Sequence, residues 1–240
     1  MKNITTLLLS LLLFTACKTS EWTSLFDGKS LDGWHVECRP ADREKTYWTV
    51  DEGTIMCNSL GDKKHHYVWL VSDKKYKDFI LTFRFQAYKE SKGNSGVQVR
   101  STYDSSLAGG WLNGPQVDIH PKEPMTWRTG MIYDETHEVQ RWLCPARQNW
   151  SMSKDYEPKE HVFKFSDDGN GWNEMVIICK GNHIKTIVNG IVRSDWDGTG
   201  ILDDFVHEMR KSGRKGHIAL QLHRNDELKI RFKDIMIKKL

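Results

Sequence analysis

The sequence predicts an all-β protein, a β-sandwich with long inserted loops and one short helix. Short segments rich in β-branched and aromatic residues recur along the 240-residue chain and are separated by Gly, Asn and Asp. The junctions Lys180–His183 and Val188–Ile191 contain Asn and Gly, which tolerate the positive φ of tight hairpin turns. Strands are expected over residues 47–50, 54–57, 67–71, 79–87, 96–100, 116–120, 161–165, 174–180, 183–188, 191–194, 217–223 and 228–238.

One helix and one long loop complete this expected architecture. Only Leu202–Lys211 has apolar residues three or four apart with acids before and bases after, as in an amphipathic helix. The segment Pro121–Glu160 has no clear periodicity and is expected to be an inserted loop. Its aromatic residues, Trp127 and Trp142 among them, argue against disorder and favour a functional loop.

The N-terminal segment has the pattern of an export signal. Its apolar run over residues 7–14 is too short to span a bilayer, so residues 1–16 are expected to be a signal peptide. Thr15-Ala16-Cys17 resembles a lipobox, in which Cys17 is acylated, although a plain secretory signal is the alternative. We therefore expect an exported lipoprotein, periplasmic or anchored to the outer membrane by lipid alone, with a single β-sandwich domain over residues 22–240.

The charge composition of the chain limits the classes of binding partner. The chain has 35 Lys and Arg against 32 Asp and Glu, a net charge of +3, and the two signs are interspersed. Without a basic block, nucleic acid is not an expected partner. Four of the five cysteines follow Cys17 without CxxC spacing, so at most one disulfide is expected.

Polar and apolar residues alternate along the predicted strands. In Phe79–Ala87 every odd position is apolar, which places those side chains in the core. Three other strands alternate in the same way, and their polar residues are of types that bind or titrate. The alternative is that these polar side chains simply face solvent, as the outer faces of an antiparallel sandwich do. These residues are Gln98, Arg100, Gln116, Asp118, His120, Gln221 and His223.

This polar face suits a carbohydrate. Amide, carboxylate and guanidinium groups form paired hydrogen bonds with adjacent hydroxyls, while aromatic rings stack on the apolar faces of sugars. The chain has ten tryptophans, and Trp127 and Trp142 lie in the loop that follows one of these strands. We expect a carbohydrate or glycoside as the substrate or ligand.

A series of motifs runs through almost all of residues 22–240. The motifs include Ser24–Trp34 (SLFDGKSLDGW), Gly93–Arg100 (GNSGVQVR), Gly114–Ile119 (GPQVDI), Thr129–Glu135 (TGMIYDE) and Gly216–His223 (GHIALQLH). Together they resemble the 3-keto-disaccharide hydrolase domain family. The resemblance implies a concanavalin-like jelly roll, an extracytoplasmic location, and cleavage of glycosides that are oxidised to a ketone at C3.

The chemistry implied by the resemblance is elimination followed by hydration. A ketone at C3 acidifies the proton on C2, and its loss lets the group on C1 depart, after which water adds back. His223 or His120 is the expected base. Arg100 is expected to stabilise the enolate, and Tyr133 or Glu135 to protonate the leaving group.

Cofactor and binding residues follow from the same reasoning. The cofactor is unknown, and a divalent metal held by Asp118, His120 and Glu135 is an alternative stabiliser of the enolate. The expected substrate-binding set is Arg100, Gln98, Gln116, Gln221, Asn94, Trp127 and Trp142. Two rival functions stay open: a conventional glycosidase that uses Asp118 with Glu135 as its carboxylate pair, and a non-catalytic sugar-binding module.

Overall fold

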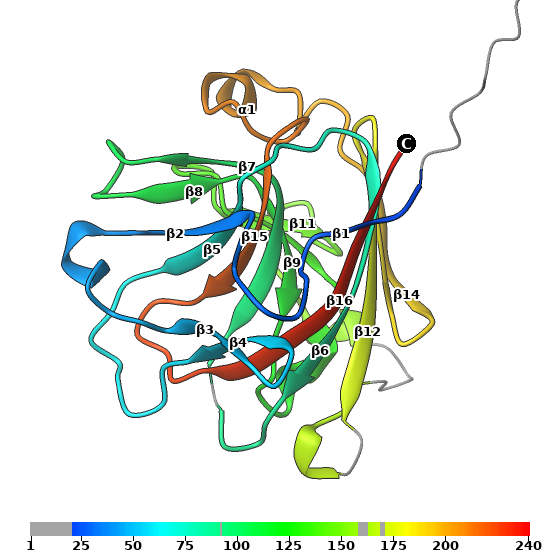
Figure 1. The fold of residues 1–240 in the computed structure, drawn as a ribbon. Coiled ribbons are helices and arrows are strands. Elements are labelled where there is room, and N and C mark those ends of the chain that lie inside the picture. The colour runs from blue at the N-terminus through cyan, green and yellow to red at the C-terminus, as the bar shows by residue number, and fades with distance from the viewer. Residues whose placement is uncertain (1–20, 92, 158–162, 169–170) are drawn as a thin grey trace, which may run out of the picture.

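The fold is a sandwich of two antiparallel β-sheets, as predicted (Figure 1). This computed structural model describes residues 21–91, 93–157, 163–168 and 171–240. The expected signal peptide at residues 1–16, the lipidation site Cys17 and residues 161–162 lie outside the described residues. Export and lipid anchoring therefore stay predictions.

The first sheet contains the longest strand, β16 (Lys229–Lys239). Its order is β14 (Ile191–Asp197), β13 (His183–Val188), β12 (Trp172–Lys180), β6 (Phe79–Ala87), β16 (Lys229–Lys239), β4 (Thr54–Asn58) and β3 (Trp48–Asp51), with β1 (Thr23–Ser24) also paired to β16. Tight hairpins join β12 to β13 and β13 to β14 at the two Asn-Gly and Gly-Asn junctions.

The second sheet has the order β11 (Arg141–Cys144), β10 (Ile132–Asp134), β9 (Pro115–Ile119), β7 (Ser95–Asp104), β15 (His217–Leu222), β5 (Val68–Ser72) and β2 (Trp34–Cys38), with β8 (Trp111–Asn113) paired to β7. The α-helix α1 (Phe205–Met209) lies at one end of the sandwich (Figure 1). Short 3₁₀ helices occupy Pro40–Asp42, Met125–Arg128, Lys154–Tyr156 and Ser166–Asp168.

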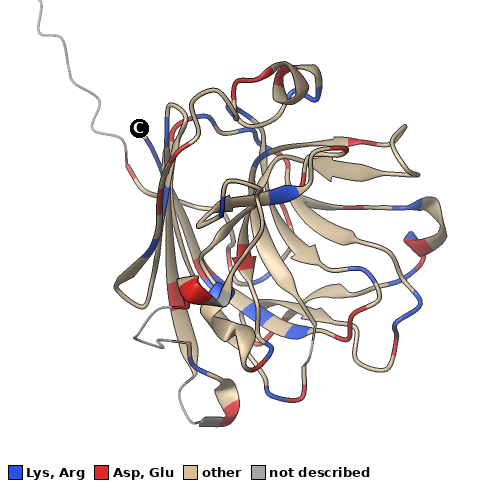
Figure 2. Cartoon of the chain, turned by 180° about the vertical axis from the view of Figure 1, so that it is seen from behind, with Lys and Arg blue, Asp and Glu red and all other residues tan. Residues whose placement is uncertain are grey.

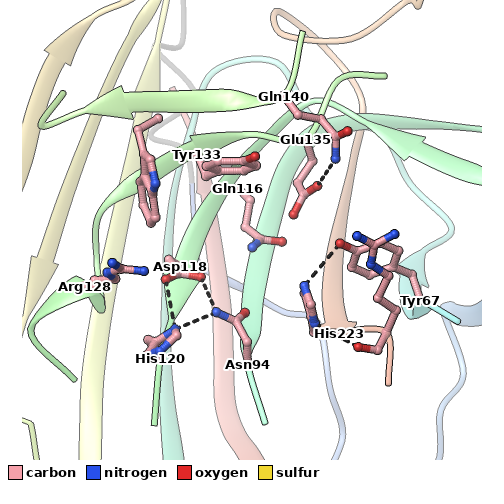
Figure 3. A pocket seen from close by; sticks show the side chains of 12 residues that line it. Tyr67, Asn94, Gln116, Asp118, His120, Arg128, Tyr133, Glu135, Gln140 and His223 are labelled. Atoms are coloured by element: carbon pink, nitrogen blue, oxygen red, sulfur yellow. Dashed lines mark hydrogen bonds and ion pairs between the residues drawn. The ribbon is translucent and has the colours of Figure 1, made fainter. Parts of the chain in front are cut away.

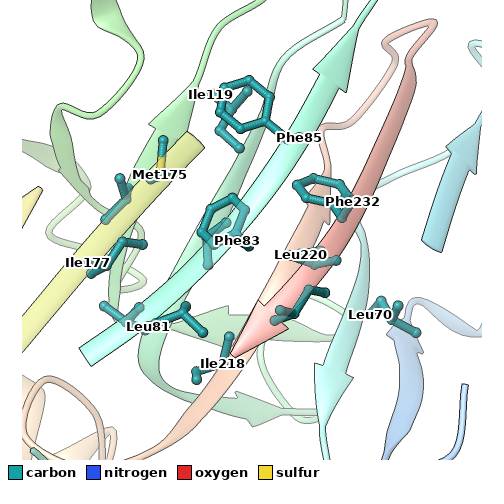
Figure 4. Close-up of a cluster of buried hydrophobic side chains, with 14 of the residues drawn as sticks. Leu70, Leu81, Phe83, Phe85, Ile119, Met175, Ile177, Ile218, Leu220 and Phe232 are labelled. Carbon is teal, nitrogen blue, oxygen red and sulfur yellow. The ribbon is translucent and has the colours of Figure 1, made fainter. Parts of the chain in front are cut away.

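The core lies between the sheets and confirms the predicted alternation. Phe83 and Phe85 of β6 point toward Ile119 of β9 and Leu220 of β15 (Figure 4), and all four are 2% exposed or less. Full burial of one such side chain stabilises the fold by about 1.5–3 kcal/mol. Because the apolar side chains of β7, β9 and β15 are used here, the polar ones must face outward.

Several short elements differ from the prediction. The predicted loop Pro121–Glu160 contains β10 and β11, whose residues Ile132 and Leu143 extend the core. These strands are too short to show a periodicity in sequence, as are β1, β2 and β8. The strand predicted at 161–165 is wrong in its described part, because Phe165 forms only an isolated bridge with Ala87. Helix α1 is also shorter than predicted and is capped by Asp204.

Charges and cysteines agree with the expectations from composition. Positive and negative residues are interspersed over loops and strand ends, and most strand segments are uncharged (Figure 2). Cys38, Cys57, Cys144 and Cys179 are all free thiols, so these four form no disulfide. Within the described ranges, no helix combines the length and apolar character needed to cross a membrane.

Arg100 does not belong to the polar face, which corrects the role expected for it. Its backbone has a φ of 53°, a left-handed conformation that ends the regular alternation of β7. The fully buried guanidinium donates to Lys77 O and Gly181 O, both at 2.6 Å, and to Asp78 Oδ1 at 3.0 Å. Arg100 therefore ties together turns at one end of the sandwich and is a structural residue.

Arg100→Met should destabilise the fold, because it leaves the Asp78 carboxylate and the carbonyl oxygens of Lys77 and Gly181 without their donor. We expect the free energy of unfolding to fall by about 3 kcal/mol or more in urea denaturation. Arg84→Met is the matched control, because Arg84 is an exposed arginine of β6 whose ion pair with Asp234 spans 3.6 Å. Its effect should stay within about 0.5 kcal/mol. Equal unfolding midpoints for the two variants would contradict a structural role for Arg100.

Candidate active site

A pocket of about 350 Å³ lies on the outer face of the second sheet, where the predicted polar residues meet. Strands β9, β10 and β11 supply one side, and the chain around the ends of β5, β7 and β15 supplies the other (Figure 3). The lining residues are Tyr67, Asn94, Gln116, Asp118, His120, Arg128, Tyr133, Glu135, Gln140, Trp142, His223 and Arg224.

Strand register builds the floor of this pocket. Val117 and Ile119 point into the core, so Gln116 and Asp118 point outward from β9. Gly96 of β7 pairs with Asp118, and a Cβ at Gly96 would lie 2.4 Å from Gln116 Cδ. The absence of a side chain at Gly96 is therefore what allows the Gln116 carboxamide to lie across the sheet.

Asp118, Asn94 and His120 form one corner of the pocket (Figure 3). Asn94 Nδ2 donates to Asp118 Oδ1 at 3.1 Å and to His120 Nδ1 at 2.7 Å. Burial raises the pKa of the Asp118 carboxyl to about 7, although the Asn94 hydrogen bond and the Arg128 charge act in the opposite direction. Burial lowers the pKa of His120 to about 4, so its imidazole is neutral at pH near 7.

His223 forms the opposite corner with Tyr67 and Asp226. Its Nδ1 lies 3.0 Å from Asp226 Oδ2, and its Nε2 lies 3.2 Å from the Tyr67 hydroxyl. Burial lowers the pKa of His223, but Asp226 outweighs burial and the net pKa is raised above its ordinary value. For Asp226, burial is in turn outweighed by the hydrogen bond from His223, and its pKa is lowered. This pairing favours a protonated imidazole.

Glu135 lies between the two corners and is almost completely buried. Gln221 Nε2 donates to Glu135 Oε1 at 3.3 Å, and Gln140 Nε2 donates to Oε2 at 3.5 Å. Burial nevertheless raises the pKa of Glu135 above its ordinary value, and burial also raises the pKa of the neighbouring Tyr133 hydroxyl to about 12. Tyr133 is therefore protonated near neutral pH and able to donate a hydrogen bond.

Arg128 supplies a positive charge beside Asp118 (Figure 3). Its guanidinium carbon lies 5.6 Å from the ring centroids of both Trp127 and Trp142. No carboxylate among the described residues forms an ion pair with Arg128, and its Nε is buried without a partner in the protein. The positive charge of Arg128 therefore faces a pocket that contains Asp118.

The structure brings together eight of the residues expected from sequence and leaves four outside the lining. Gln98 donates to Leu112 O beneath β8, Gln221 lies under the floor and contacts Glu135, and Trp127 is buried behind Arg128. Arg100 is remote from the pocket, as described above. The eight that line it are Asn94, Gln116, Asp118, His120, Tyr133, Glu135, Trp142 and His223.

Sequence reasoning missed five residues of this site. Asp226 had a local signal, because it follows His223 by three residues in a polar turn. The sequence indicated Arg128 and Arg224 only weakly: each directly follows a predicted site residue, Trp127 or His223. Tyr67 and Gln140 had none, because only the packing of strands distant in sequence brings them to the pocket.

The family model for the 3-keto-alpha-glucoside-1,2-lyase-like domain matches residues 21–238. The chain belongs to this family. Membership confirms the resemblance noted from the motifs and makes the chain a carbohydrate-active domain of glycosyl hydrolase-like or carbohydrate-binding type. No curated protein matches the sequence.

Solved structures similar to this lyase-like domain share its fold. A candidate glycosyl hydrolase from Parabacteroides distasonis is 21% identical over 92% of this chain and 100% of its own, with a TM-score of 0.54. A carbohydrate-binding module from Bacillus subtilis is 12% identical over 86% of this chain and 96% of its own, at 0.51. A Bacillus subtilis protein with a galectin-like fold is 13% identical over 87% and 90%, at 0.55. These likenesses establish the concanavalin-like jelly roll.

The three residues considered as metal ligands do not form a ligand cluster in the lyase-like domain. Asp118 Oδ2 lies 3.7 Å from His120 Nδ1, but the Glu135 oxygens accept from Gln221 and Gln140. In the part of the chain that the structure describes, no group of three or more His, Cys, Asp or Glu is arranged to hold a metal ion. We therefore assign no step to a metal.

The raised pKa of Asp118 predicts a pH-dependent stability difference between wild type and Asp118→Asn. The folded state retains the Asp118 proton up to pH near 7, so this contribution is fully present below the pKa of the unfolded chain and is lost as pH rises through 7. From about pH 5 to about pH 8, the wild type should lose about 3 kcal/mol of unfolding free energy relative to Asp118→Asn. Urea denaturation at the two pH values measures it. A difference independent of pH would show that the carboxyl is not desolvated.

Proposed function

We propose that the pocket cleaves glycosides whose sugar is oxidised to a ketone at C3, by β-elimination followed by hydration. One observation carries the proposal: a carboxyl group with a pKa of about 7 lies opposite a histidine whose pKa is raised by Asp226. Elimination needs a base and an acid that are both in the correct protonation state near neutral pH. The pKa of Asp118 near 7 suits the base, and the raised pKa of His223 favours the acid.

The elimination step uses Asp118 as the base. Its carboxylate removes the proton from C2, and the electron pair forms an enolate with the C3 ketone. The enolate then expels the oxygen on C1, which leaves a C1=C2 double bond, and His223 Nε2 donates its proton to the departing oxygen. In the hydration step water attacks C1, neutral His223 takes a proton from that water, and Asp118 returns its proton to C2.

Asp118 is a better base than either histidine selected from the sequence. His120 Nδ1 accepts from Asn94, and its pKa of about 4 makes it a weak base. His223 is biased toward the protonated form, which suits an acid. His120 and Asn94 instead orient the Asp118 carboxyl.

Arg128 and Glu135 are placed to stabilise the enolate oxygen. Arg128 lies beside Asp118, so a sugar with C2 at Asp118 can direct its C3 oxygen toward the guanidinium (Figure 3). Burial raises the pKa of Glu135, and the protonated form of this carboxyl would donate a hydrogen bond to the enolate oxygen. This orientation also directs C1 and its leaving group toward His223.

Unpartnered buried atoms support a polyhydroxylated substrate. Asn94 Oδ1, Gln116 Oε1 and His120 Nε2 are buried and have no hydrogen-bond partner within the protein. Buried polar atoms without partners are uncommon in folded proteins, and each favours a site for a ligand. Two acceptors and one donor beside the catalytic pair match the hydroxyl groups of a sugar.

The proposal predicts cleavage of a 3-keto-glucoside and no cleavage of the same glucoside with a hydroxyl at C3. Only the ketone makes the C2 proton acidic enough for Asp118 to remove. Both compounds are incubated with the protein, and products are identified by mass spectrometry. Equal cleavage of the two would identify a conventional glycosidase, whereas binding of both without turnover would identify a sugar-binding module.

Removing the base or the acid should abolish most turnover of the 3-keto-glucoside without unfolding the protein. For Asp118→Asn and for His223→Gln, kcat is expected to fall by about 10²–10⁴-fold, the usual contribution of a positioned proton-transfer group. His183→Gln is the matched control, because His183 is a half-exposed histidine of β13 in the other sheet, paired with Asp195. It should retain wild-type kcat. Unchanged turnover in Asp118→Asn would remove Asp118 as the base.

A further inference from the structure

The His223 side of the pocket continues into a group of three basic residues, Arg224, His66 and Arg39, here called the basic rim. Arg224 lines the pocket, and its guanidinium carbon lies 5.8 Å from the centroid of the Tyr67 ring. The His66 ring is 5.1 Å from the same Tyr67 ring, centroid to centroid. Tyr67 therefore connects the basic rim to His223.

With a pKa of about 4, His66 is neutral near pH 7, so the positive charge of the basic rim comes from Arg39 and Arg224. Burial, followed by the positive charges of Arg39 and Arg224, lowers the pKa of His66 to about 4. Of the three, Arg224 lines the pocket, and its positive charge favours the binding of an anion there. The rim thus has the electrostatic character of an anion site.

Among the carboxylates that the structure describes, none forms an ion pair with Arg39 or Arg224. Asp42 accepts from the His66 backbone N–H at 2.9 Å and contacts Lys45 Nζ at 3.5 Å, so its carboxylate is already paired. The Asp226 carboxylate is already paired with His223 and accepts a hydrogen bond from the Asn94 backbone N–H. Among the described residues, neither Arg39 nor Arg224 has an ion-pair partner, and Arg39 Nε and His66 Nδ1 are buried without hydrogen-bond partners.

We propose that the basic rim binds a carboxylate on the leaving group of the substrate, so that the protein prefers glycosides of hydroxy acids or acidic sugars. The inference rests on the proposed function for its orientation: if His223 protonates the departing oxygen, the leaving group lies between His223 and Arg224. A guanidinium recognises a carboxylate through paired hydrogen bonds, and a site with unpaired cations favours an anion over a neutral isostere.

Binding of two model leaving groups tests the rim without requiring catalysis. The probes are 4-hydroxybenzoate and its neutral analogue 4-hydroxybenzamide, titrated by NMR into wild type, Arg224→Gln and Arg39→Gln. The carboxylate should bind the wild type about fivefold more tightly than the amide, as for a partly exposed ion pair, and added salt should reduce the preference. Each variant should lose most of this preference, while Arg84→Gln on the opposite sheet should keep it. Equal affinity of the wild type for both probes would overturn the inference.

Turnover of the 3-keto-glucosides of the same two phenols separates this inference from the proposed function. A ratio of kcat/KM that favours the carboxylate, and that falls in Arg224→Gln but not in Arg84→Gln, supports both. Cleavage of both glucosides with an unchanged ratio in Arg224→Gln contradicts carboxylate binding at the basic rim but agrees with the proposed function. Preferential binding of 4-hydroxybenzoate without cleavage of either glucoside overturns the function and leaves the anion site standing.

Discussion

The pocket depends on the removal of two carboxyl groups from water on what is nominally the outer face of a sheet. Asp118 is 3% exposed and Glu135 is 5% exposed. Strands β10 and β11, with the loop that joins them, cover this face and supply the enclosing residues Tyr133, Gln140 and Trp142. Because burial disfavours the charged form of a carboxyl group, an ordinary acidic side chain acquires a pKa suited to proton transfer near neutral pH.

The surrounding residues limit the cost of this burial without cancelling its effect on the pKa. Asn94 donates to Asp118, and Gln221 and Gln140 donate to Glu135, but all three donors are neutral amides. A fully paired arginine or lysine in their place would return the carboxyl pKa toward or below its ordinary value. Asp226 shows this contrast, because its contact with His223 lowers its pKa at a distance of 3.0 Å. The pKa values of Asp118 and Glu135, which have neutral amide partners, are thus raised, whereas the pKa of Asp226, which has a histidine partner, is lowered.

Alternation predicted the floor of the site but not its walls. Val117 and Ile119 pointed to the core in sequence, and that was sufficient to place Gln116 and Asp118 on the opposite face. The same rule failed for Arg100, because the positive φ at that residue interrupts the alternation of the strand. An arginine in the sequence does not indicate such a backbone conformation.

The walls depend on contacts between residues distant in sequence. Tyr67 lies next to His223, although 156 positions separate them in the chain. Strands of three or four residues, such as β10 and β11, are formed by pairing with their neighbours, so no local pattern identifies them. The family motifs indicated that these segments belong together but not which side chains meet.

The central claim is that the buried carboxylate of Asp118 breaks the C2–H bond of a 3-keto sugar. The most direct measurement compares kcat/KM for a 3-keto-glucoside with that for the same compound carrying deuterium at C2. If Asp118 removes this proton in the rate-limiting elimination, the deuterated substrate reacts more slowly, with a primary isotope effect that disappears for the residual activity of Asp118→Asn. Equal rates for the two substrates, with C1–O cleavage intact, would contradict the account and favour direct displacement at C1.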